Sequence, residues 1–117
     1  MAVQLPDLSR VDSRLNPELA VDGLAFILPL YGGFVYGHRA ARSFFKYTPD
    51  SLNPVCITLD DGTPQFAAQD WELWHSGMPR ERCLLHHFAN NGGLTRSWNA
   101  GLLAAQKLGC RYAIAGN

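Results

Sequence analysis

Two adjacent carboxylates are the residues whose type and spacing most suggest chemistry. Asp60 and Asp61 directly follow the apolar run 55–59, and Gly62 and Thr63 come next. Because neighbouring carboxylates repel each other, such a corner favours partners that donate hydrogen bonds or carry positive charge. Nucleobase N–H groups and ribose hydroxyls are donors of this kind, and a carboxylate accepts from them strongly.

A structural role is the alternative for this acidic corner. Thr63 and Pro64 are typical of a helix start, because Thr can cap free main-chain amides and Pro fits the first helical position. One carboxylate would then serve as a further cap while the other faced solvent. Spacing alone leaves both interpretations open.

A second polar segment covers residues 90–101, Asn-Asn-Gly-Gly-Leu-Thr-Arg-Ser-Trp-Asn-Ala-Gly. A glycine pair ahead of a helix can present free amides to a phosphate. Arg96, near the expected helix start, could reach a diphosphate, and Gly101 permits close packing of the helix on a strand. Taken singly, each residue also has an ordinary explanation as a turn, a surface charge or a packing contact.

Apolar runs and helical stripes alternate along the chain. We expect strands at 24–30, 55–59, 82–88 and 112–115, and helices at 35–48, 64–77 and 94–108. This alternation predicts an α/β fold, a three-layer Rossmann-like parallel sheet with helices on both faces. The three cysteines are 27 residues apart, about one strand–helix unit. Ligands of such sheets bind beyond the carboxyl ends of the strands.

Composition limits the function classes. The chain has 117 residues and a net charge of zero, which fits one domain and argues against general nucleic-acid binding. Its longest apolar run, 24–31, contains Pro29 and is too short to span a membrane. An odd number of cysteines without a C-x-x-C pair favours a reducing compartment, so we expect a cytoplasmic location. Residues 1–23 are expected to be an N-terminal extension that packs on the domain formed by 24–117.

Several of these features occur together in one known family. They are Pro29 and Tyr31 at a strand end, the acidic corner, Asn91 and Gly93, the helix from Leu94 to Gly101, and the strand at Tyr112. In this order they resemble the nucleotide-binding half of a family 2 glycosyltransferase with the GT-A fold, over residues 26–117. The resemblance implies a nucleotide-diphosphate sugar donor, with a UDP-sugar expected. It also implies that Pro29 and Tyr31 border the base, that Asp61 together with Asp60 takes uracil or ribose, and that Arg96 approaches the phosphates.

The resemblance has two departures. The family usually has Asn after the Tyr, where this chain has Gly32. Its D-x-D-type motif, whose carboxylates hold Mn²⁺ or Mg²⁺, would begin at about Asn117, the last residue of the sequence. We therefore expect the metal ligands, the general base and the acceptor-binding half to lie beyond these residues. The sheet is then incomplete with an exposed apolar edge, and no residue present is assigned as catalytic.

Two other functions stay open. A Rossmann dinucleotide-binding domain has a similar layout, but Gly32, Gly33 and Gly37 do not form G-x-G-x-x-G. A non-catalytic remnant that binds a nucleotide or a partner protein is the other alternative. The histidines add little: His86 and His87 should point to opposite faces of a strand, so they cannot share a metal, and His38 and His75 are expected on helix surfaces. The sequence does not indicate the acceptor or the sugar, and it leaves a homo-oligomer open.

Overall fold

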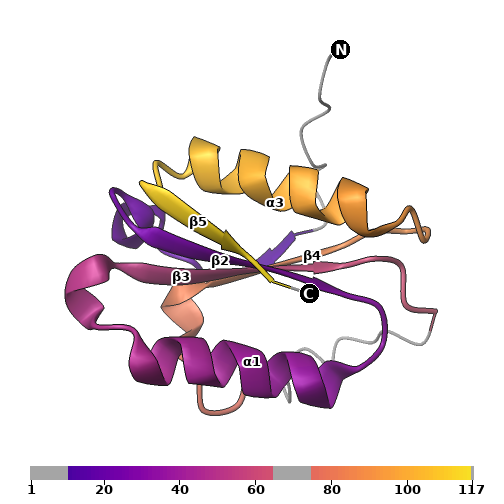
Figure 1. The fold of residues 1–117 in the computed structure, drawn as a ribbon, viewed down its shortest axis with the longest axis horizontal. Coiled ribbons are helices and arrows are strands. Elements are labelled where there is room, and N and C mark those ends of the chain that lie inside the picture. The colour runs from indigo at the N-terminus through magenta and orange to yellow at the C-terminus, as the bar shows by residue number, and fades with distance from the viewer. Residues whose placement is uncertain (1–10, 65–74, 117) are drawn as a thin grey trace.

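The computed structural model describes residues 11–64 and 75–116, and within them one sheet lies between two helices. The strands are β1 (Val11–Ser13), β2 (Leu24–Leu30), β3 (Pro54–Asp60), β4 (Cys83–His87) and β5 (Tyr112–Ala115). The helices are α1 (Phe34–Tyr47) and α3 (Leu94–Lys107). Figure 1 shows α3 on one face of the sheet and α1 on the other, so the expected three layers are present.

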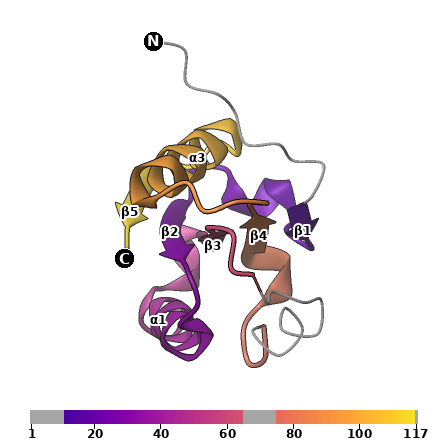
Figure 2. The same ribbon diagram turned by 90° about the vertical axis from the view of Figure 1, so that its right-hand side faces the viewer.

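The strand order is β1-β4-β3-β2-β5, as the row of strands in Figure 2 shows. The strands β4, β3, β2 and β5 are parallel, and β1 pairs with β4 in the antiparallel direction. If the four parallel strands β2, β3, β4 and β5 are numbered 1 to 4 along the chain, their order across the sheet is 3-2-1-4. The same order occurs at the centre of Rossmann sheets. The chain therefore has an α/β fold with a Rossmann-like parallel sheet.

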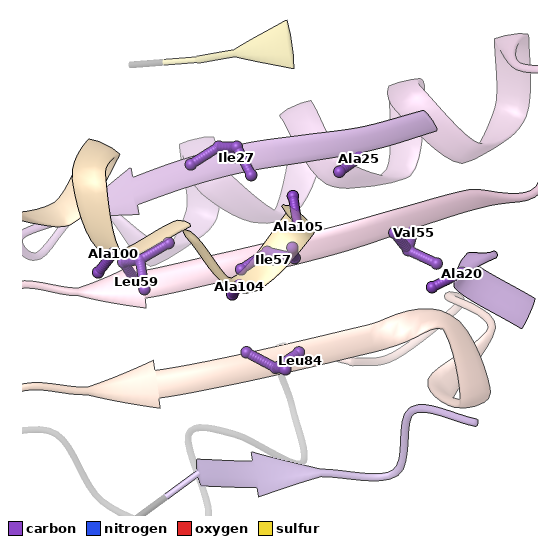
Figure 3. Close-up of a cluster of buried hydrophobic side chains, with 10 residues drawn as sticks. All are labelled: Ala20, Ala25, Ile27, Val55, Ile57, Leu59, Leu84, Ala100, Ala104 and Ala105. Carbon is purple, nitrogen blue, oxygen red and sulfur yellow. The ribbon is translucent and has the colours of Figure 1, made fainter. Parts of the chain in front are cut away.

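Burial explains why β3 is the central strand. All seven of its residues are buried, which suits an apolar strand covered on both faces. Above it, small residues of α3 pack on branched residues of β2 and β3, as Figure 3 shows for Ala100, Ala104, Ile27 and Leu59. A Cβ on Gly101 would lie 2.2 Å from Ile27 Cγ2, so this glycine allows the close approach of α3 that the sequence suggested.

The expected strands β2 to β5 and the helices α1 and α3 begin and end within one residue of the predicted positions. The helix expected at 64–77 falls mostly on residues outside the described ranges. Where it is described, the N-terminal extension adds β1 and a short 3-10 helix, Pro17–Ala20, whose Ala20 is fully buried in the core. The antiparallel edge strand β1 was not predicted.

The outer edge of the sheet is apolar and open at β5. All four residues of β5 are exposed, and the exposed fractions of Tyr112 and Ile114 are 67 % and 49 %. This agrees with the expected exposure of an apolar sheet edge. Among the described residues, no helix is long and apolar enough to cross a membrane.

Candidate functional site

The ends of three neighbouring parallel strands meet at one side of the sheet. Register places Leu30, Asp60 and His87 side by side at the ends of β2, β3 and β4. We call this region the carboxyl edge, and it comprises residues 31–33, 60–63 and 87–96. Its strand ends point toward the viewer in Figure 2, between α1 and α3.

Asp60 links the three strand ends through its carboxylate. The residue is fully buried, and its Oδ1 accepts a hydrogen bond of 2.6 Å from the Thr63 hydroxyl. Its Oδ2 accepts a 3.3 Å bond from the Thr63 main-chain N–H and pairs with Nδ1 of His87. The Thr63 hydroxyl oxygen in turn accepts from the Gly32 N–H at 2.8 Å. Asp60 therefore holds the carboxyl edge together by hydrogen bonds made inside the protein.

Asp61 joins the end of β3 to the turn before α3. Its two carboxylate oxygens accept hydrogen bonds of 2.9 Å each from the N–H groups of Gly92 and Gly93. Arg96 Nη2 donates to Asp61 Oδ1 at 2.6 Å and also to the Asn90 carbonyl. The side chain of Asp61 is thus nearly closed off from solvent, with 6 % of the residue exposed.

Gly62 makes this arrangement possible because it brings two loops together. Its φ of +78° lies in the left-handed region that favours glycine. A Cβ at this position would lie 2.5 Å from the carbonyl carbon of Asn90. Only glycine allows the 60–63 corner to approach the turn after β4 so closely, and this approach brings Asp61 within hydrogen-bond distance of that turn.

The end of β2 has a different character, because it faces solvent. Tyr31 is 59 % exposed, and Gly32 and Gly33 both have positive φ with no atom within 4 Å of an added Cβ. Pro29 lies inside β2, where it is buried and in register with Leu59. Of the five candidates from the sequence, Asp60, Asp61 and Arg96 cluster, Tyr31 borders them, and Pro29 lies within the sheet.

Two residues of the edge were missed by sequence reasoning. His87 pairs with Asp60, and the Arg96 guanidinium lies 4.0 Å from the centroid of the Phe88 ring. A signal for His87 did exist: it ends the strand beside β3, and register makes it the neighbour of Asp60. As expected, His86 turns the other way, is buried, and packs edge-on against Phe88.

Two structural expectations are wrong. Neither carboxylate of the acidic corner faces solvent, because Asp60 is fully buried and Asp61 is covered by the turn after β4. His75 is not on a helix surface; it lies in a turn and is buried, with 4 % of the residue exposed. The covering of Asp61 is a long-range contact, which local spacing does not reveal.

Comparison with known proteins gives no further guide to the site. No family model, no curated protein and no solved structure matches the chain. Within residues 11–64 and 75–116, no group of three His, Cys, Asp or Glu side chains gathers in a way that could hold a metal ion. The carboxyl edge instead offers an exposed aromatic ring, an open glycine turn and a carboxylate–guanidinium pair.

Proposed function

We propose that the chain is the donor-binding part of a glycosyltransferase that resembles family 2 and takes a UDP-sugar. The observation that supports this proposal is the meeting of Asp61 and Arg96 at the carboxyl edge, where the exposed Tyr31 follows the neighbouring strand β2. In Rossmann-like sheets this is the edge at which nucleotides bind. We propose both the transfer of the sugar to an acceptor and a cytoplasmic location for the whole protein.

The proposal assigns each group a contact. Tyr31 borders the base, and its exposed ring can stack on it, whereas Pro29, buried within β2, supports the strand end that carries Tyr31. Asp61 Oδ1 already accepts two hydrogen bonds, whereas Oδ2 accepts one from the described residues. A carboxylate oxygen can accept two, so Oδ2 keeps one acceptor position, which uracil or ribose must reach past the turn that covers Asp61. Asp60, being fully buried, holds the edge in shape for these contacts.

Arg96 is placed to approach a diphosphate, but its charge is partly offset. Its Nη2 donates to Asp61 and Asn90, while its buried Nε has no hydrogen-bond partner among the described residues. A phosphate must therefore compete with Asp61 for the positive charge of the guanidinium. Because of this competition, we expect modest affinity for a diphosphate alone and a larger contribution of the base to the binding free energy.

The divalent metal, Mn²⁺ or Mg²⁺, belongs to the proposal through the resemblance. Among the described residues, no group of three acidic, His or Cys side chains could bind it, so we place its ligands outside them. When bound, such an ion would supply positive charge that offsets the charge of the diphosphate. The residues present orient the base and ribose, and none of them is assigned a proton transfer.

Titration calorimetry with UDP tests the proposal on the 117-residue chain. The key variant is Tyr31→Ala, and the matched control is Tyr112→Ala, since Tyr112 is similarly exposed but begins β5 at the opposite side of the sheet. Loss of base stacking, about 1–3 kcal/mol, should weaken UDP binding roughly 5- to 150-fold for Tyr31→Ala only. Neither tyrosine is buried, so neither variant should impair folding.

Three results would contradict the proposal or redirect it. Absence of UDP binding, with and without Mn²⁺, would contradict it, and so would equal effects of the two tyrosine substitutions. Preferential binding of NAD would favour a dinucleotide-binding domain, which shares the strand order of this sheet. Turnover of a panel of nucleotide-sugars by a longer chain that includes further residues would separate an enzyme from a nucleotide-binding remnant.

A further inference from the structure

The exposed side of α1 is positively charged and contains no compensating acid. Arg39, Arg42 and Lys46 follow one another at steps of three and four residues, so they lie on one side of the helix. The sequence of α1 includes no Asp or Glu. No hydrogen bond or ion pair joins Arg39 or Arg42 to another described residue. The whole chain is neutral, so this charge is a local feature.

The same side chains line a hollow of about 590 Å³ that also includes Ser43, Tyr47 and Gly77. Gly77 forms part of its wall, close to the guanidinium of Arg42. A Cβ added there would lie 3.4 Å from Arg42 Nε, and the φ of +78° already favours glycine. The volume lies within the range of small-molecule sites, about 300–1,000 Å³.

We propose that this hollow binds a ligand that carries clustered phosphate groups. Guanidinium groups form bidentate hydrogen bonds with phosphate, and among the described residues no carboxylate lines the hollow to repel an anion. From Arg39 to Lys46 the helix rises about 10 Å, which is more than one phosphate can span. A polyphosphate in solution and a phospholipid headgroup share the required chemistry.

This site is separate from the carboxyl edge. Gly33 precedes α1 at the edge, whereas the hollow is lined by residues 39–47 in the rest of the helix. The inference therefore does not depend on the proposed function. It assigns a role to a basic helix surface that donor binding leaves unexplained.

The test compares two double variants that remove the same charge. One is Arg39→Ala with Arg42→Ala, and the control is Lys107→Ala with Arg111→Ala, two exposed cations outside the hollow. Calorimetric titration with tripolyphosphate should show binding to the wild type and the control. Binding to the Arg39/Arg42 variant should be weaker by about tenfold or more, since each lost bond involves two charged groups. Equal weakening of both variants, or no binding to the wild type, would overturn the inference.

Vesicles distinguish the two sources of phosphate. Co-sedimentation uses phosphatidylcholine vesicles that contain phosphatidic acid, with pure phosphatidylcholine as the blank. Binding that is lost in the Arg39/Arg42 variant and kept in the control identifies a lipid headgroup, whereas binding of tripolyphosphate alone identifies a soluble ligand. Far-ultraviolet circular dichroism verifies that the exposed substitutions leave the fold intact.

UDP titration of the same variants separates this inference from the proposed function. If donor binding occurs at the carboxyl edge, the Arg39/Arg42 variant keeps its UDP affinity while Tyr31→Ala loses it. If UDP affinity falls in the Arg39/Arg42 variant and not in Tyr31→Ala, the hollow takes the phosphates and the proposed function fails.

Discussion

The ends of β2 and β3 lie side by side at the carboxyl edge, yet they are built in opposite ways. At the end of β3, Asp60 and Asp61 are buried; Asp60 accepts hydrogen bonds from Thr63 of the same corner, and Asp61 accepts them from the turn after β4. At the end of β2, Tyr31 is exposed, and Gly32 and Gly33 turn in open space. The end of β3 thus holds the carboxyl edge together, while the end of β2 is exposed to solvent.

This difference separates structural from contact residues among the candidates. A buried charge is stable only where donors surround it, and removing one partner costs far more than an exposed pair contributes. The two aspartates should therefore dominate stability. Tyr31, which has no such role, should dominate binding. Substitutions at the two strand ends test this division.

The largest expected effect is that of Asp60→Ala. The substitution leaves the Thr63 hydroxyl and the His87 ring without their buried acceptor. We expect the free energy of unfolding to fall by about 3–5 kcal/mol, measured by urea denaturation. The control, Asp50→Ala, removes an exposed carboxylate and should change it by no more than about 0.5 kcal/mol. A similar, small loss for both variants would show that Asp60 does not organise the edge.

Alanine at Gly62 and at Gly33 gives a matched comparison of the two strand ends. Both glycines have positive φ, so both substitutions carry a backbone strain of about 1–2 kcal/mol. At Gly62 the new Cβ would also overlap the main chain of Asn90, which adds about 1–3 kcal/mol. Thermal or urea unfolding should rank the stability of Gly62→Ala well below that of Gly33→Ala. Equal losses would mean that the two loops can move apart at little cost.

Asp61→Asn should loosen one loop rather than the whole fold. The amide keeps an acceptor but loses the charge that Arg96, Gly92 and Gly93 bind, at a cost of about 1–3 kcal/mol. Hydrogen exchange of the Gly92 and Gly93 amides should then become faster, while amides of β3 stay protected. Asp50→Asn serves as the control. If exchange rises equally throughout the sheet, the contact has no local role.

The fold was predictable because its signals are local. Apolar runs bounded by Gly and Pro mark β2 to β5, and the stripe of α3 ends at Gly109, which has the positive φ of a helix stop. The strand β1 was not predictable, since its pairing with β4 connects residues more than 70 positions apart. No local pattern in Val11–Ser13 indicates a strand.

The candidate site was predictable only in parts. The acidic corner and the 90–96 segment were recognised separately, but their direct contact depends on the close approach at Gly62. The partnership of Asp60 with His87 follows from the register of β3 and β4, which spacing along the chain does not fix. The sequence also did not reveal which of these residues are exposed to solvent. The carboxylates expected to contact a ligand are buried, whereas Tyr31 at the end of the neighbouring strand is exposed.

The smallest expected effect concerns Cys56, a buried titratable group on β3 whose thiol lies 3.6 Å from the Thr58 hydroxyl oxygen. Burial raises the pKa of the Cys56 thiol to about 12 from 9.0. Between these values the unfolded chain loses this proton first, so stability is unaffected below pH 9 and falls as the pH rises toward 12. At pH 10 the loss from Cys56 should be on the order of 1 kcal/mol. Urea denaturation across this range should give a shallower decline for Cys56→Ala than for the wild type, and identical declines would show that the thiol does not stay protonated in the fold.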